Sequence, residues 1–250
     1  MIIRKSPDEI EIMREAGRIT AAALRCVAEN IRPGVTTLKL DAIAEDVIRS
    51  LGATPAFKGY HGFPASICAS INNEVVHGIP SERRLKEGDI LSVDVGAVLD
   101  GYHGDCAITF AVGEVDHRAS HLMTVTKRAL EAGIAKAVVG AKLSDVSAEI
   151  QKVAEAEGFG VVREYVGHGI GRSMHEEPQI PNFGPPGQGP TLKAGMVLAI
   201  EPMINAGGHE VRSLPDGWTV VTADDSLSAH YEHTVAIHET GPQVLTEYRG

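Results

Sequence analysis

The alternation of apolar and polar positions predicts that each half of the chain begins with helices and continues with strands. Ser6 can cap a helix, and Glu9 completes a capping box three residues later. A first helix is therefore predicted from Ser6 to about Asn30, and a second at about Leu38–Leu51. Short strands separated by turn residues are predicted from about Thr54 to Phe110.

The second half repeats this order of elements. Helices are predicted near Asp116–Val139 and Ser144–Glu157, followed by strands to about His238. Paired helices followed by runs of strands favour an α+β fold with a mostly antiparallel sheet. We expect one domain over residues 1–250, built from halves at about 1–112 and 113–250, whose strands form one curved layer covered by helices on one face.

An internal duplication supports the division into two halves. Lys86–Asp94 and Lys193–Glu201 share the pattern Lys-x-Gly-x-(Ile/Val)-Leu-(Ser/Ala)-(Val/Ile)-(Asp/Glu), and Gly34–Gly52 aligns with Gly140–Gly158 at almost the same separation. Each nine-residue stretch reads as a buried strand that ends in an acid. A buried carboxylate is costly unless it is paired, so two at equivalent places predict acids gathered around one cation site.

A hairpin is predicted to bring two acids together. Strands at Val93–Val98 and Tyr102–Phe110 flank Asp100-Gly101, a typical two-residue turn. Asp94 and Asp105 would then be diagonal neighbours on one face, roughly 7–8 Å apart at the backbone. A solvated strand face is the alternative, with the valines on either side of Asp94 facing the core. The predicted cross-strand pairs are Leu99 with Tyr102, Gly96 with Asp105, and Asp94 with Ala107.

Three further residues extend this candidate site. His168 lies between glycines, Glu201 ends the second repeated strand, and strand alternation places Glu232 on one face with Thr234 and Ala236. Each alone is more often structural. Together with the two aspartates they make four carboxylates and one imidazole, a donor set that suits hard or borderline divalent metals and balances the charge of two such ions.

Composition excludes several classes of protein. A net charge of −10 argues against a general nucleic-acid or anionic-membrane binder. No apolar run approaches the roughly 18 residues of a membrane-spanning helix, and Met1–Lys5 leads directly into a capped helix, so no signal peptide is expected. Cys26, Cys68 and Cys106 lack metal-binding spacing and suit free thiols in a reducing cytosol.

The chain resembles the type I methionine aminopeptidases over essentially its whole length. The resemblance rests on Asp94, Asp105, His168, Glu201 and Glu232 in that order, and on the strings around them. It implies the two-halved pita-bread fold, with these five residues as ligands of two divalent ions (Co, Mn, Fe or Zn). The chain lacks the large insert of type II enzymes and an N-terminal Cys/His module, so it resembles the minimal bacterial form. The matching strings are Tyr60–Pro64, Asn73–Pro80, Gly167–Gly171, His175–Pro178 and Tyr231–His233.

The resemblance also implies an activity and residue roles. It implies metal-dependent removal of the initiator methionine from nascent polypeptides when the second residue is small. His77 would lie near the first peptide group, His175 would stabilise the oxyanion and Glu201 would shuttle the proton. Met174 stands where Phe is frequent in the family, and Phe57 where Cys is frequent. The apolar pocket for the first side chain maps onto Tyr60, Phe63, Cys68, His77, Met174 and Trp218.

The expected partners are the N-termini of nascent polypeptides, with the ribosome as a further candidate. No specific nucleic acid or membrane is expected, and we predict a cytoplasmic monomer. A proline-directed aminopeptidase or dipeptidase, a non-enzymatic binding module of the same fold and a metal-storage protein remain alternatives. His117 and His121 are expected on a solvated helix face. The histidines with no independent claim to a role are His61, His103, His209, His230, His233 and His238.

Overall fold

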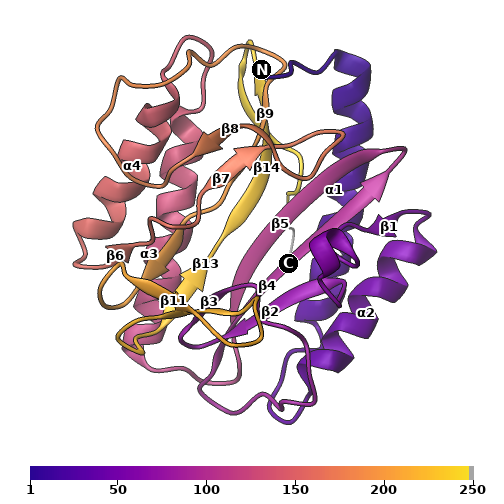
Figure 1. Ribbon diagram of the computed structural model, residues 1–250, viewed down its shortest axis with the longest axis vertical. Coiled ribbons are helices and arrows are strands. Elements are labelled where there is room, and N and C mark those ends of the chain that lie inside the picture. Colours follow the sequence, from indigo (N-terminus) through magenta and orange to yellow (C-terminus); the bar gives the residue numbers. More distant parts are fainter. Residues whose placement is uncertain (248–250) are drawn as a thin grey trace.

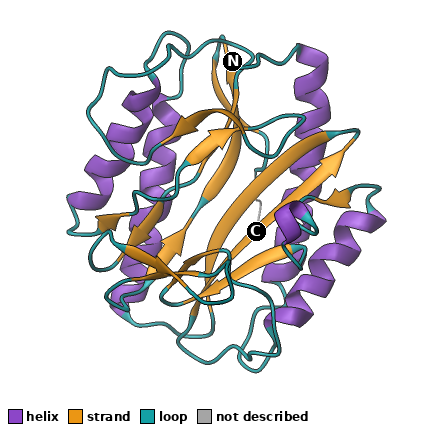
Figure 2. Ribbon diagram, viewed as in Figure 1, coloured by secondary structure: helices purple, strands orange, loops and turns teal. Residues whose placement is uncertain are grey.

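The computed structural model describes residues 1–247 and has the predicted α+β architecture. Figure 1 shows a strongly curved antiparallel sheet with one helix pair beside each half. The secondary-structure view in Figure 2 shows that the helices lie on the outside of this curve. Among residues 1–247, no helix combines the length and the apolar character that crossing a membrane requires.

The four α-helices of residues 1–247 lie where the sequence predicts them. Ser6 caps α1 (Pro7–Ala28) with its side chain, and Glu9 closes the capping box, as expected. The others are α2 (Thr37–Ser50), α3 (His117–Lys136) and α4 (Leu143–Glu155). The predicted end of the third helix at Val139 is wrong, because Ala137 leaves the helical conformation at ψ 59°.

The strands are short outside one long hairpin. The predicted run of strands after Thr54 is interrupted by η1 (Tyr60–Gly62), a 3-10 turn that the strand pattern did not indicate. The first-half strands are β1 (Thr54–Pro55), β2 (Ile67–Ile71), β3 (Glu74–Val76), β4 (Ile90–Leu99) and β5 (Tyr102–Ala111). The second-half strands are β6 (Gly160–Val161), β7 (Gly167–Gly169), β8 (Glu176–Ile180), β9 (Val197–Ile200), β10 (Met203–Asn205), β11 (Val211–Ser213), β12 (Val220–Thr222), β13 (Ser228–His230), β14 (Glu232–His238) and β15 (Gly241–Val244).

The main sheet joins strands of both halves. Its order is β1-β4-β5-β14-β9-β7-β8, with β2 beside β4 and β15 beside β14, and all of its pairs are antiparallel. Two three-stranded sheets, β13-β10-β6 and β11-β12-β3, lie at its side. The neighbours β5 and β14 therefore form the seam between the halves, where Glu232 pairs with Ala107 and His233 with Cys106.

The predicted hairpin register is confirmed. Leu99 pairs with Tyr102, Gly96 with Asp105 and Asp94 with Ala107. The strand is buried on both faces: Val93 and Val95 are fully buried against the helix-side core, while Asp94 lines a cavity on the other face. The valines therefore face the core, and the alternative of a solvated strand face is wrong, because Asp94 has a buried carboxyl oxygen and lines the cavity.

Each half has its own core beneath its helix pair. Leu24 and Leu40 pack with the strands of the first half, and Leu122 and Ile150 pack with those of the second. All four side chains are fully buried. The helices thus hold the strands from outside and leave the concave face free for polar groups.

Candidate active site

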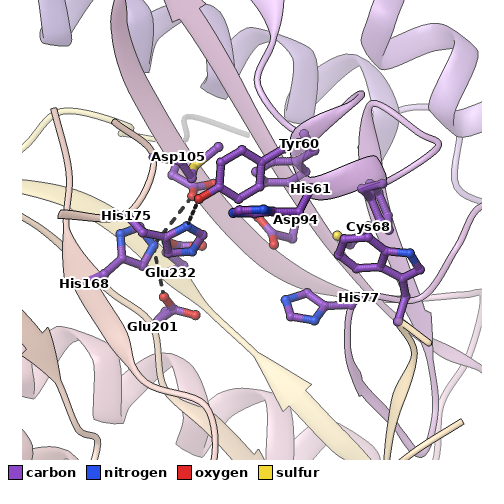
Figure 3. A pocket seen from close by; sticks show the side chains of 14 residues that line it. Tyr60, His61, Cys68, His77, Asp94, Asp105, His168, His175, Glu201 and Glu232 are labelled. Atoms are coloured by element: carbon purple, nitrogen blue, oxygen red, sulfur yellow. Dashed lines mark hydrogen bonds and ion pairs between the residues drawn. The ribbon is translucent and has the colours of Figure 1, made fainter. Parts of the chain in front are cut away.

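A cavity of about 240 Å³ lies on the concave face, where the two halves meet. Figure 3 shows side chains from both halves pointing into it. Every site residue predicted from the sequence lines this cavity, and His61 and Phe57 join them. The lining residues are Phe57, Tyr60, His61, Phe63, Cys68, His77, Asp94, Asp105, His168, Met174, His175, Glu201, Trp218 and Glu232.

Strand ends and the hairpin bring the polar group together. Asp94 lies on β4 and Asp105 on β5, whereas His168 lies on β7, Glu201 directly follows β9 and Glu232 begins β14. The sheet order places these strands side by side, although the chain separates them widely. The duplicated Asp94 and Glu201 therefore reach one cavity from opposite halves, as the repeat predicted.

The backbone around Asp105 is fixed across the seam. Its amide donates to Thr234 Oγ1 at 3.0 Å, and the Thr234 hydroxyl donates to the Asp105 carbonyl at 2.8 Å. Thr234 is two residues after Glu232, so β14 both supplies the Glu232 carboxyl and fixes the backbone of Asp105 through hydrogen bonds. This double hydrogen bond holds the Asp105 carboxyl in place without occupying its oxygens.

His168 presents one ring nitrogen to the acids. Its Nδ1 lies 2.9 Å from the Gly169 carbonyl, so Nδ1–H donates there and the Nε2 lone pair faces the cavity. Nε2 is 3.4 Å from Glu201 Oε1 and 4.0 Å from Asp105 Oδ2. A side chain at Gly167 would collide with the Ala199 carbonyl, so only glycine lets β7 pass this close to β9.

The acids lack the partners that buried carboxylates normally need. Asp94 Oδ1, Asp105 Oδ1 and Glu232 Oε1 are buried without a hydrogen bond, and within residues 1–247 no Lys or Arg pairs with these acids or with Glu201. Burial, and then their mutual repulsion, raises the pKa of Asp94, Glu201 and Glu232 well above the ordinary range. Burial likewise raises the pKa of Asp105 to about 7.

A divalent cation fits this arrangement. Unpaired carboxylates in a low-dielectric site repel one another, and a cation between them removes that cost. Donor atoms of Asp105, His168 and Glu232 lie within 4.8 Å of one another. Burial lowers the pKa of His168 to about 4, so its imidazole is neutral and able to ligate.

His230 belongs to this cluster and was missed by sequence reasoning. It is 2% exposed, and its Nε2 has no hydrogen-bond partner although it lies 3.6 Å from Glu201 Oε2. One potential metal-ligating atom each from His230, Glu201 and Glu232 lie within 4.8 Å of one another. The signal was available, because His230 is two residues before Glu232 and strand alternation gives both the same face.

An apolar pocket adjoins the polar cluster. Phe63 and Trp218 meet edge to face with ring centroids 5.1 Å apart, and His77 lies edge-on to Trp218 at 6.5 Å. Met174 and Cys68 are almost fully buried beside them. The pocket therefore has an apolar end for a side chain and opens on to the carboxylates and histidines.

The segment that carries His175 is anchored from outside the cavity. Lys5 Nζ pairs with Glu176 at 2.7 Å in a nearly buried ion pair, and the His103 amide donates to the Gly171 carbonyl at 2.9 Å. The Glu176 carboxylate is thus paired with Lys5, and among residues 1–247 the structure records no ion pair between Glu176 and His175. His117 and His121 lie on α3 away from the cavity, as expected, where His121 contacts Glu157 at 3.3 Å.

The metal-free protein is expected to lose stability as pH rises from 7 to 8. Its site carboxyls have raised pKa values, whereas in the unfolded chain they titrate near pH 4, so the folded state binds more protons and stability falls with pH. Buried histidines with lowered pKa values have the opposite effect, but only below about pH 6.5. Each carboxyl that stays protonated contributes a slope of about 1.4 kcal/mol per pH unit.

Urea midpoints of chelated protein at pH 7 and pH 8 would measure this effect. Metal-loaded protein is the control, because its carboxylates are ionised in both the folded and the unfolded state and its midpoint should change little. Equal midpoints for the chelated protein at the two pH values would contradict the prediction.

Comparison with known proteins identifies the class. Residues 11–239 match the model of metallopeptidase family M24, and the chain belongs to this family. The chain is 56% identical over 246 residues to the methionine aminopeptidase of Clostridium perfringens, an alignment that covers 98% of this chain and 99% of the relative. Within family M24 it therefore belongs to the methionine aminopeptidases.

Solved structures agree with this assignment. The crystal structure of methionine aminopeptidase from Thermotoga maritima superposes with a TM-score of 0.97 at 50% identity, covering 99% of this chain and 100% of that one. Prolidase from Pyrococcus furiosus shares the fold with a TM-score of 0.82 at 25% identity, but the match covers only 66% of that chain. The pita-bread fold expected from the sequence is confirmed.

Proposed function

We propose that this protein is a metal-dependent aminopeptidase that removes the initiator methionine from polypeptides whose second residue is small. The observation that carries the proposal is the apolar pocket opening on to four carboxyls and an imidazole. Such a cavity can hold an apolar first side chain while the peptide bond behind it lies against the polar cluster. Relatives named methionine aminopeptidase match over nearly their full length.

The proposed ligands of two divalent ions are Asp94, Asp105, His168, Glu201 and Glu232. Carboxylate oxygens with a single imidazole suit Mn²⁺, Fe²⁺, Co²⁺ or Zn²⁺. When bound, such ions lower the pKa of a water molecule and polarise a carbonyl group. The orphaned carboxyl oxygens and the neutral His168 support this assignment.

Protein groups supply the remaining chemistry. Glu201 directs Oε1 toward His168 and Oε2 toward His230, so one oxygen can ligate while the other takes a proton from water and delivers it to the leaving amine. His175, exposed at the cavity, donates a hydrogen bond to the oxygen that becomes negative. His77, whose pKa burial lowers to about 4, meets the first peptide group as a neutral imidazole.

The five proposed ligands and the pocket favour catalysis over the alternatives. A binding module that had lost catalysis would not need the complete ligand set, and a storage site would not need an apolar pocket beside it. Structural similarity to prolidase keeps proline-directed cleavage as the competing activity.

Peptide selectivity is expected to separate the two activities. Met-Ala and Met-Gly peptides should be cleaved, whereas Met-Leu and Met-Lys peptides should resist. N-acetylated Met-Ala is the matched control and should also resist, because an aminopeptidase requires a free amine. Chelation should abolish turnover, and readdition of single metals should restore it. Faster cleavage of a Xaa-Pro peptide than of Met-Ala would favour the prolidase-like activity instead.

We further propose that the protein acts in the cytoplasm as a monomer on nascent chains, with the ribosome as the candidate site of encounter. Three free cysteines support a reducing compartment. The net charge of −10 argues that any contact with ribosomal RNA would be local.

A further inference from the structure

Tyr60 contacts the proposed oxyanion-binding histidine through a polar atom as well as through its ring. The Tyr60 hydroxyl lies 2.7 Å from His175 Nδ1, and the two ring centroids are 5.4 Å apart. Tyr60 belongs to η1 in the first half, whereas His175 directly precedes β8 in the second. Figure 3 shows this hydrogen bond crossing the cavity between the halves.

Both residues are held in place by their own surroundings. Gly59, at φ 88°, caps η1, and its amide donates to the Phe63 carbonyl at 2.8 Å, closing a tight loop around Tyr60. The Lys5–Glu176 ion pair anchors the residue next to His175. The hydroxyl and the imidazole therefore meet as parts of two fixed segments.

The direction of this hydrogen bond decides which ring nitrogen of His175 carries the proton. The structure records no second hydrogen bond for the Tyr60 hydroxyl among residues 1–247, so its proton has no other protein acceptor. At neutral pH a phenol ordinarily keeps its proton, because its pKa is about 10, and an imidazole, with a pKa of about 6.5, is mostly neutral. A phenol that donates to Nδ1 leaves the imidazole proton on Nε2.

We propose that Tyr60 is a positioning residue, whose hydroxyl donates to Nδ1 of His175 and so keeps the imidazole proton on Nε2, facing the cavity. The inference rests on the proposed function, in which His175 must donate a hydrogen bond to the carbonyl oxygen. The opposite tautomer would present a lone pair to that oxygen and repel it. Tyr60 thus has two parts with separate tasks: the ring lines the pocket and the hydroxyl orients the histidine.

Tyr60→Phe tests the hydroxyl alone, because the ring stays in the pocket. The zinc-loaded enzyme, labelled with ¹⁵N-histidine, gives the tautomer from two-bond proton–nitrogen correlations, with the His175 signal assigned by its loss in His175→Gln. We expect the Nε2–H tautomer in the wild type and a mixture in Tyr60→Phe. Turnover (kcat) of Met-Ala should fall about 3- to 10-fold, the usual worth of one hydrogen bond, with KM and zinc content unchanged.

Tyr165→Phe is the matched control, because the Tyr165 ring lies edge-on to the other cavity histidine, His77, at 5.5 Å. It should leave the His175 tautomer as in the wild type. A wild-type His175 protonated on Nδ1, or a Tyr60→Phe variant with the wild-type tautomer and kcat, would overturn the proposal. If the wild type cleaves no peptide, the proposed function fails, while the tautomer measurement still decides the role of Tyr60.

Discussion

Replacing Asp105 by asparagine is expected to abolish tight metal binding and, with it, peptidase activity. Asp105 is 4% exposed, its backbone is clamped to Thr234, and its carboxyl faces His168. Asparagine keeps the shape but removes the charge and one ligand oxygen. The loss of metal affinity should exceed the 10- to 100-fold that is typical for residues that only support a ligand. Calorimetric metal titration and kcat/KM at saturating metal measure both effects.

Asp41→Asn provides a matched control for that variant. Asp41 is also buried, but its carboxylate accepts hydrogen bonds from the Ser66 and Ile67 amides at 2.7 and 3.0 Å, outside the cavity. We expect Asp41→Asn to lower stability without changing metal affinity. An Asp105→Asn variant that binds metal as tightly as the wild type would remove Asp105 from the proposed ligand set.

Replacing His175 by alanine is expected to lower kcat by about 10²- to 10³-fold, the usual cost of losing one donor to a developing oxyanion. Metal content should stay near the wild-type value. Within residues 1–247, the contact that the structure records between His175 and the proposed ligands is that of its ring with the His168 ring, with centroids 4.3 Å apart. Elemental analysis together with kcat on Met-Ala separates the two effects.

His121→Ala serves as the control for the loss of a histidine, because His121 lies on α3 outside the cavity. It should retain wild-type turnover. If His175→Ala instead loses its metal, His175 is a ligand and the proposed oxyanion role is wrong.

Local rules predicted the hairpin that carries the two aspartates. The period of two in a strand and the two-residue Asp100-Gly101 turn allow a single register. The structure has that register in all ten cross-strand pairs, from Ile90 opposite Ala111 to Leu99 opposite Tyr102. The start of α1 was predicted for a similar reason, because the Ser6–Glu9 capping box is encoded within a few residues. The error at the end of α3 lies where no glycine or proline marks the stop.

Hydrogen bonds and ion pairs between side chains far apart in the chain were beyond sequence reasoning. Nothing in the neighbourhood of Lys5 indicates that it reaches Glu176, 171 positions away, and the same is true of Tyr60 and His175. His230 was passed over for another reason. A histidine on a strand is ordinarily structural, so its place two residues before Glu232 was a weak signal, and the orphaned Nε2 beside Glu201 is what distinguishes it in the structure.

The seam between β5 and β14 has a consequence for the order of folding events. The clamp between Asp105 and Thr234 joins residues 129 positions apart, so the acids converge only after a long loop has closed. Neither half alone can offer metal more than part of the ligand set. We therefore expect a bound ion to slow unfolding and to leave the folding rate unchanged, because its ligand set is complete only once the two halves have docked.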